Sequence, residues 1–182
     1  PKPASTALVC LGYDDTIGIA SDVMAILPFA PTSLEGLDAS IVEIMRARRG
    51  DRSVEALPDG AAYALVEFSA KTIAEAAAAG ERLIAALRAR GTIRDALLVT
   101  DPIHRAKLWR VREDGAGLLA RQLDGTEAWT GWEDAAVAPE RLADYLRDFT
   151  ALLTSYGLTG PLYGHFGAGC VHVRIDFDFR SE

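Results

Sequence analysis

The chain has 182 residues, of which 49% are hydrophobic and 25% are charged, and its formal net charge is -7 at pH 7. The length suits one compact domain, because domains most often have about 100–150 residues, and the composition argues against a largely disordered chain. The acidic balance argues against nucleic acid as a partner, since affinity for phosphate backbones comes mainly from lysine and arginine. No apolar run approaches the roughly 18–20 residues of a membrane-spanning helix, so we expect no transmembrane segment.

Cysteine usage and the two ends of the chain bear on its cellular context. Cys10 and Cys170 lie far apart and form neither a metal-ribbon nor a redox spacing, which favours a reducing compartment. Because the chain begins without a secretory signal pattern, we expect a cytoplasmic protein. It also begins without methionine and ends directly after a strongly patterned segment. We therefore expect residues 1–182 to be one domain of a longer polypeptide.

The first quarter of the chain predicts a strand followed by two helices. Residues 7–11 form an apolar run, and Asp14 and Asp15 precede a segment with helical spacing. Aspartates suit a helix N-terminus because they accept hydrogen bonds from its unpaired N–H groups and oppose the positive end of the helix dipole. Residues 39–49 have helical spacing as well, with arginines at their C-terminal end.

A second copy of the strand–helix pattern follows at residues 61–91. An apolar strand leads to Ser69, the candidate helix cap, and then to an alanine-rich helix that ends at Gly91. Residues 95–100 predict a further strand. The repeated pattern predicts an α+β fold with ferredoxin-like repeats, an antiparallel sheet and helices packed mainly on one face. A doubly wound parallel sheet is the alternative, but the chain lacks a glycine-rich strand-to-helix turn of the GxGxxG or GxxxxGK[ST] type.

Two helices are predicted in the second half of the chain. Residues 101–120 begin with Asp-Pro, a common helix start, and place Trp109 and Arg112 on one helix face. Arg112 could bind a carboxylate through its two-pronged guanidinium, or it could be a solvent-exposed member of the charged run RVRED. Residues 139–157 have the apolar spacing of an amphipathic helix.

The stretch GHFGAGCVH, residues 164–172, predicts a hairpin. Apolar and polar residues alternate from position 171 onward, which is typical of a strand with two different faces. A turn centred on Ala168-Gly169 would place His165 opposite His172, and Tyr163 opposite Arg174, on the polar face.

Two neighbouring imidazoles can share one metal ion, although a complete site usually needs three or four ligands. The alternative is that His165 and His172 are ordinary polar-face residues. Cys170 is predicted to point to the opposite face as a small buried hydrophobe. A phosphate-binding loop is disfavoured because a strand follows this turn, whereas such loops are followed by a helix.

Three segments resemble a known family: LWRVRED (residues 108–114), WEDAAVAPERLADYLRDF (132–149) and LYGHFGAGCVHVRIDFDF (162–179). They are similar to the C-terminal substrate (cap) domain of FAD-linked oxidases and dehydrogenases, the vanillyl-alcohol-oxidase or PCMH-type flavoproteins. This group includes D-lactate dehydrogenase, D-2-hydroxyglutarate dehydrogenase and one component of glycolate oxidase. The resemblance is greatest to its large bacterial FAD/FMN-containing dehydrogenases, covers most of the chain, and is most specific at the histidine hairpin.

The resemblance implies roles for particular residues. In metal-dependent members the hairpin reads Gly-His-x-Gly-Asp-Gly-x-x-His, which implies that His165 and His172 bind a divalent metal such as zinc. Arg112 matches the arginine that binds the substrate carboxylate, and Trp109 and Arg174 are further substrate-binding candidates.

The sequence also departs from the family. Ala168 stands where the family usually has aspartate, which would disturb the turn or its hydrogen bonds without removing a ligand. The family's third metal ligand, a glutamate, would lie beyond Glu182. The catalytic base is expected outside the chain as well.

The implied activity is oxidation of a small 2-hydroxy acid by hydride transfer to flavin. FAD would be bound by a separate domain of the same polypeptide, with an iron–sulfur cluster elsewhere in the full-length protein and a peripheral membrane association through an electron-acceptor partner. The chain alone would then be inactive. The alternative is a stand-alone ferredoxin-like module that binds a small molecule or regulates another protein without catalysis.

Overall fold

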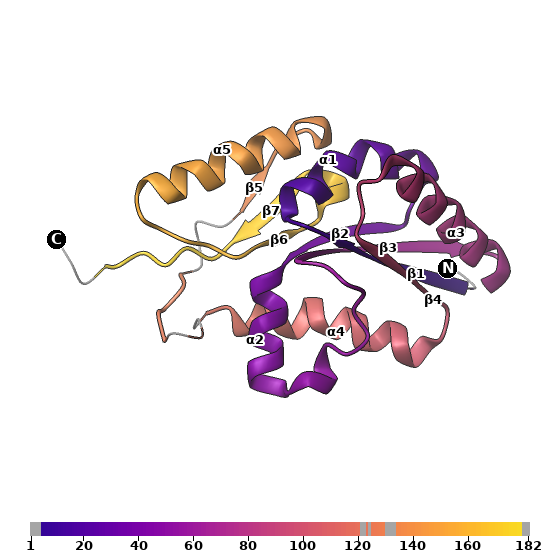
Figure 1. The fold of residues 1–182 in the computed structure, drawn as a ribbon, viewed down its shortest axis with the longest axis horizontal. Coiled ribbons are helices and arrows are strands. Elements are labelled where there is room, and N and C mark those ends of the chain that lie inside the picture. Colours follow the sequence, from indigo (N-terminus) through magenta and orange to yellow (C-terminus); the bar gives the residue numbers. More distant parts are fainter. Residues whose placement is uncertain (1–4, 121–122, 124, 130–133, 180–182) are drawn as a thin grey trace.

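The computed structural model describes residues 5–120, 123, 125–129 and 134–179. Within these residues, one sheet has the strand order β4-β1-β3-β2-β6-β7-β5, and every neighbouring pair is antiparallel (Figure 1). Its strands are β1 (Ser5–Tyr13), β2 (Ser33–Asp38), β3 (Ala62–Ala70), β4 (Asp95–Val99), β5 (Ala135–Ala136), β6 (Leu162–Gly164) and β7 (Cys170–Val173). The α-helices are α1 (Thr16–Ile26), α2 (Ala39–Arg49), α3 (Ile73–Arg90), α4 (Pro102–Leu118) and α5 (Leu142–Ser155). The predicted α+β class and antiparallel sheet are confirmed.

Helices cover both faces of the sheet. Helices α1, α3 and α5 pack over one face, and α2 and α4 pack over the other, as Figure 1 shows. We predicted helices mainly on one face, and three of these helices do share a face, but α2 and α4 cover the other. The reason lies in the central strands: in β1, Val9 and Leu11 are fully buried on one side, and Leu8 and Cys10 are fully buried on the other. A strand with apolar side chains on both sides is stable only when other elements cover both faces of its sheet.

Side-chain caps begin the helices where the sequence supplies them. Asp15 accepts from the backbone N–H of Gly18 at the start of α1, as predicted. The N-cap of helix α3 is Thr72 and not the predicted Ser69, because Thr72 and Glu75 form a reciprocal capping box. Ser69 lies within β3, where it accepts a hydrogen bond from the Thr32 hydroxyl.

A buried polar cluster links α1 to the end of α3. The carboxylate of Asp22, which is 1% exposed, accepts hydrogen bonds from the Tyr13 and Thr92 hydroxyls and pairs with Arg90. Burial raises the pKa of the Tyr13 phenol, and the nearby Asp22 charge raises it further. The cluster lies on the sheet face that α1 and α3 cover, and it holds these two helices together.

None of the helices in the described part of the chain combines the length and the apolar character that crossing a bilayer requires.

Candidate functional site

The histidine hairpin is formed by β6 and β7, and its register differs from the prediction. Tyr163 pairs with His172 and Leu162 pairs with Val173, so the predicted pairs His165–His172 and Tyr163–Arg174 are wrong. The turn is longer than expected, because a short 3-10 helix, η4 (Phe166–Ala168), precedes Gly169, whose φ is +70°.

The two imidazoles nevertheless lie side by side. The register differs by two residues, and a shift of two keeps every side chain on the same face of a strand. The ring centroids of His165 and His172 are 5.5 Å apart, with the rings nearly perpendicular. The His172 ring is also 5.1 Å from the ring of Tyr163. The predicted proximity of the two histidines is therefore confirmed, although the predicted pairing was wrong.

Cys170 was predicted to be buried on the face opposite to His172, and the structure corrects this. Val171 and Val173 are buried, whereas Cys170 and His172, which alternate with them, are partly exposed. Residues two apart in a strand share a face, so Cys170 belongs to the histidine side. Its thiol lies 3.8 Å from the carbonyl oxygen of Ala168 and does not join the histidine pair.

Each imidazole contacts a carboxylate through its Nδ1 atom. Nδ1 of His165 is 2.7 Å from Oε1 of Glu35 on β2, and Nδ1 of His172 is 2.6 Å from Oδ1 of Asp134. Among the described residues, the Nε2 atoms make no hydrogen bond to protein. Histidines that bind metals usually have this arrangement, with one ring nitrogen held by a carboxylate and the other open to the metal.

Arg112 reaches the same carboxylate from α4. Its Nε atom donates to Oε2 of Glu35 at 3.1 Å, and its guanidinium carbon lies 5.2 Å from the centre of the Tyr163 ring. The Arg112 side chain is 16% exposed and that of Glu35 is 8% exposed. Arg112 is thus part of a mostly buried ion pair, which excludes the alternative that it is simply a solvent-exposed residue.

The other two predicted substrate-binding residues lie outside this network. Trp109 shares the sheet-facing side of α4 with Arg112, but its indole N–H donates to Glu67 on β3 at 3.3 Å. Arg174 follows β7, and its buried Nε atom has no hydrogen-bond partner among the residues that the structure describes. By strand alternation Arg174 lies on the same side as His172, since Val173 and Ile175 are buried in the opposite core.

Glu35 is the central residue of the site and was not predicted. It lies in a stretch whose sequence indicates only a short extended piece containing Pro31 and Gly36. The available signal was a glutamate that stands between Leu34 and Gly36-Leu37 in an extended segment. A cavity of about 260 Å³ opens beside Glu35, His165 and Ala168.

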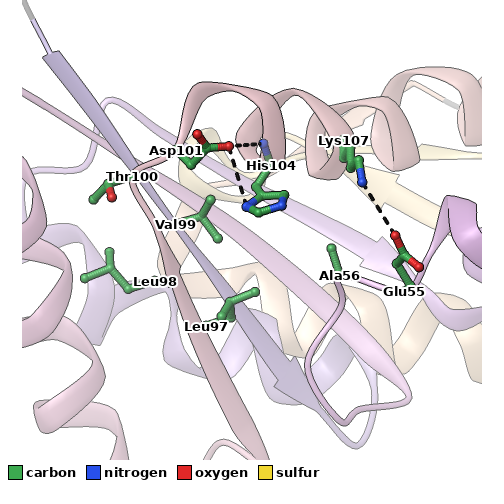
Figure 2. A pocket seen from close by; sticks show the side chains of 9 residues that line it. All are labelled: Glu55, Ala56, Leu97, Leu98, Val99, Thr100, Asp101, His104 and Lys107. Atoms are coloured by element: carbon green, nitrogen blue, oxygen red, sulfur yellow. Dashed lines mark hydrogen bonds and ion pairs between the residues drawn. The ribbon is translucent and has the colours of Figure 1, made fainter.

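A separate cavity of about 470 Å³ lies between β4 and the first turns of α4. Figure 2 shows that Asp101 accepts a hydrogen bond from the backbone N–H of His104 and lies 3.5 Å from its ring, and that Lys107 points toward Glu55. Three strands separate β4 from β6 in the sheet, so this cavity is not part of the histidine site. The Asp101 contact to the His104 backbone is the N-terminal cap of α4.

The described residues contain no cluster of three or more His, Cys, Asp or Glu side chains placed to hold a metal ion. The histidine pair is therefore an incomplete ligand set within this part of the chain.

The antiparallel sheet, its two helical layers and the polar network at β2, β6 and α4 define an α+β domain with one mixed acidic, basic and imidazole site. The chain matches the family described as FAD linked oxidases, C-terminal domain, over residues 2–182, and it belongs to that family. The resemblance seen in the sequence is confirmed.

Similar proteins include enzymes named D-2-hydroxyglutarate dehydrogenase. The chain is 29% identical over 189 residues to the one from Pseudomonas putida, covering 100% of this chain and 19% of that protein. It is 28% identical to the one from Pantoea ananatis, covering 98% of this chain and 18% of that protein. The chain thus spans about a fifth of the length of these curated relatives.

Two solved structures have the same fold at low sequence identity. A crystal structure of p-cresol methylhydroxylase with substrate bound matches with a TM-score of 0.62 and 14% identity, covering 98% of this chain and 40% of that chain. Alkyldihydroxyacetonephosphate synthase matches with a TM-score of 0.54 and 10% identity, covering 95% of this chain and 36% of that chain.

Proposed function

We propose that this domain supplies the substrate-binding residues of an FAD-dependent oxidoreductase that oxidises a small 2-hydroxy acid. The observation that carries the proposal is the mostly buried Arg112 beside two imidazoles whose Nε2 atoms have no partner among the described residues. An arginine and a histidine pair on one surface suit a ligand with a carboxylate next to a hydroxyl group. Membership of the FAD-linked family and the names of the relatives support the same reaction class.

Arg112 binds the substrate carboxylate in this proposal. Its Nε atom is occupied by Glu35, which leaves the terminal guanidinium nitrogens for a second carboxylate. Glu35 also limits the movement of the guanidinium, so less side-chain entropy is lost when substrate binds. Trp109 is proposed as a wall beside Arg112, held by Glu67.

His165 and His172 are proposed to hold a divalent cation such as zinc. Imidazole nitrogens are good zinc ligands, and both rings already have the carboxylate contact at Nδ1 that metal-binding histidines favour. The pair therefore fits half of a site, and a further ligand would come from another part of the full-length protein. A bound cation would supply Lewis acidity to the substrate hydroxyl.

The alanine at position 168 is compatible with this assignment. Its backbone N–H donates to the carbonyl of His165 at 2.9 Å within the η4 turn. The turn thus forms without the aspartate that the family usually has there. We expect the substitution to change the hydrogen bonds around the turn and not the identity of the two nitrogen ligands.

The substrate class is proposed to be a small 2-hydroxy acid of the lactate, glycolate or 2-hydroxyglutarate type. Arg174 is the candidate for a second carboxylate, because its buried Nε atom has no hydrogen-bond partner within the described part of the chain and its side chain lies on the same side as His172. A dicarboxylate would then be preferred over lactate. Comparing kcat/KM for the two substrates before and after an Arg174→Met substitution measures this preference.

The remaining components are proposed to lie in other parts of the polypeptide or in partners. FAD, held by a separate domain, would supply the hydride acceptor. The catalytic base and an iron–sulfur cluster are proposed for the same outside regions. A cytoplasmic location, with peripheral association to a membrane-bound electron acceptor, is also proposed.

Single histidine substitutions in the full-length protein test this function. We expect His165→Ala and His172→Ala to abolish metal-dependent turnover of a 2-hydroxy acid and to lower the bound metal. His104→Ala is the matched control, because this exposed histidine lies at the first turn of α4, by the separate cavity. Metal content by mass spectrometry and steady-state kinetics are the measurements. Unchanged metal content and activity in the two hairpin variants would refute the metal assignment.

A further inference from the structure

The Glu35 carboxylate lies between the two kinds of binding residue used in the proposed function. Oε1 is 2.7 Å from Nδ1 of His165, and Oε2 is 3.1 Å from Nε of Arg112. Ser33 also donates its hydroxyl to Oε1, at 3.3 Å. Glu35 comes from β2, Arg112 from α4 and His165 from the turn after β6, so one side chain joins three elements of the fold.

The burial of Glu35 makes these contacts restrictive. Its side chain is 8% exposed, and a buried carboxylate is costly unless it is paired and hydrogen-bonded. Rotating Arg112 away would leave the buried charge without its cation, and rotating His165 away would leave Oε1 with only the longer hydrogen bond from Ser33. The two partners are therefore held in one orientation relative to each other.

The contacts of Glu35 also determine which nitrogen atoms of His165 and Arg112 can bind a ligand. A carboxylate accepts hydrogen bonds, so the neutral His165 ring carries its proton on Nδ1, and Nε2 presents its lone pair. Arg112 gives Nε to Glu35 and keeps its terminal nitrogens for another anion.

We propose that Glu35 is a positioning residue that aligns Arg112 and Nε2 of His165 on one bound 2-hydroxy acid. This inference rests on the proposed function, because it assigns a common task to two of its residues. Glu35 itself touches neither the substrate nor the cation. Its effect passes through both partners, which makes the carboxylate-binding and the metal-binding parts of the site dependent on one another.

The test compares Glu35→Gln with Glu55→Gln in the full-length flavoprotein. Glu55 also pairs with a cation on α4, Lys107, at 3.5 Å, but this pair is exposed and lies by the separate cavity. One measurement is the zinc affinity of the metal-free protein, by competition with a chelator. The other is KM and kcat for D-2-hydroxyglutarate at saturating zinc.

We expect Glu35→Gln to weaken zinc binding by about 10- to 100-fold, the usual effect of removing a hydrogen-bond partner from a metal-binding histidine. KM should rise even at saturating zinc, because Arg112 loses its anchor. Glu55→Gln should leave both quantities unchanged. If Glu35 were merely structural, its variant would melt at a lower temperature but keep the zinc affinity and KM of the wild type, and that result would overturn the inference.

Two further outcomes are distinguishable. If the wild-type protein neither binds zinc nor oxidises a 2-hydroxy acid, the proposed function fails and this inference fails with it. If Glu35→Gln does not fold, Glu35→Asp replaces it: this variant keeps the charge but is one methylene too short to reach both partners. Weaker zinc binding or a higher KM in Glu35→Asp supports the inference, and wild-type values for both contradict it.

Discussion

Replacing Arg112 by lysine separates the charge of this residue from its geometry. The lysine ammonium keeps the positive charge but lacks the planar fork that donates to two anions at once. In the structure the Arg112 Nε–Glu35 contact of 3.1 Å occupies one side of the guanidinium, and the substrate carboxylate is proposed to use the rest. A lysine that satisfies the buried Glu35 is therefore withdrawn from the substrate.

The expected magnitude follows from the loss of one charge-assisted hydrogen bond. Such bonds contribute about 1.5–3 kcal/mol, and each 1.36 kcal/mol changes a rate constant tenfold, so kcat/KM should fall by roughly 10- to 150-fold. Steady-state kinetics of the full-length protein with a 2-hydroxy acid measure this. Arg110→Lys is the control, since Arg110 is exposed on the same helix. If both variants have the same kcat/KM, Arg112 does not bind the substrate carboxylate.

Three further predictions concern the fold and the histidine pair. Gly169→Ala should lower the melting temperature much more than Gly91→Ala does. Both glycines have φ near +70°, so both substitutions strain the backbone. A Cβ at Gly169 would also lie 1.9 Å from a backbone carbonyl oxygen, whereas none of the described atoms lies within 4 Å of a Cβ at Gly91. Burial raises the pKa of Tyr13, so the phenol ionises more readily in the unfolded chain than in the folded one. The free energy of unfolding should therefore keep its full value below about pH 10 and fall as the pH rises further. Urea titrations should show a smaller fall in Tyr13→Phe, which has no phenol to ionise. Asp134→Asn should weaken zinc binding less than Glu35→Gln, because the Asp134 side chain is 84% exposed and water can replace its contact to His172; equal losses in chelator competition would contradict this.

The elements of the fold were largely predictable because their signals are local. The apolar run in β1, the Asp-Pro start of α4 and the glycine at the end of α3 each act within a few residues. Successive residues of β1 are apolar, at odd and at even positions alike, and this pattern already indicates that both faces of the sheet are covered. The start of α3 was misplaced because Ser69 is a good cap residue, yet Thr72 has the glutamate three residues later that completes a capping box.

The hairpin register was not predictable from local pattern because a tertiary contact sets it. Phe166 is fully buried and packs on Gly36 of β2, where a Cβ would lie 2.4 Å from the phenylalanine ring. Burying this ring draws residues 166–168 into a 3-10 turn and lengthens the loop by two residues. The histidines still meet because a shift of two preserves the strand face.

Glu35 could not be found from spacing because its partners are distant in the sequence. Arg112 lies 77 residues away and His165 lies 130 residues away. Only the packing of α4 against α2 and the sheet, from which Arg112 reaches Glu35, and the pairing of β2 with β6 bring them together. Arg112, His165 and His172 could be named as binding candidates from their spacing together with the family resemblance, whereas the residue that connects two of them could not.

The most direct test of the proposed function is anaerobic mixing of the full-length flavoprotein with a single 2-hydroxy acid while flavin absorbance is recorded. We predict that D-2-hydroxyglutarate bleaches the flavin in the wild-type protein, and that the bleaching is lost in His165→Ala and greatly slowed in Arg112→Lys. A full-length protein that carries no flavin, or a flavin that these substitutions leave equally reducible, would contradict the claim that this domain binds the substrate of the reaction.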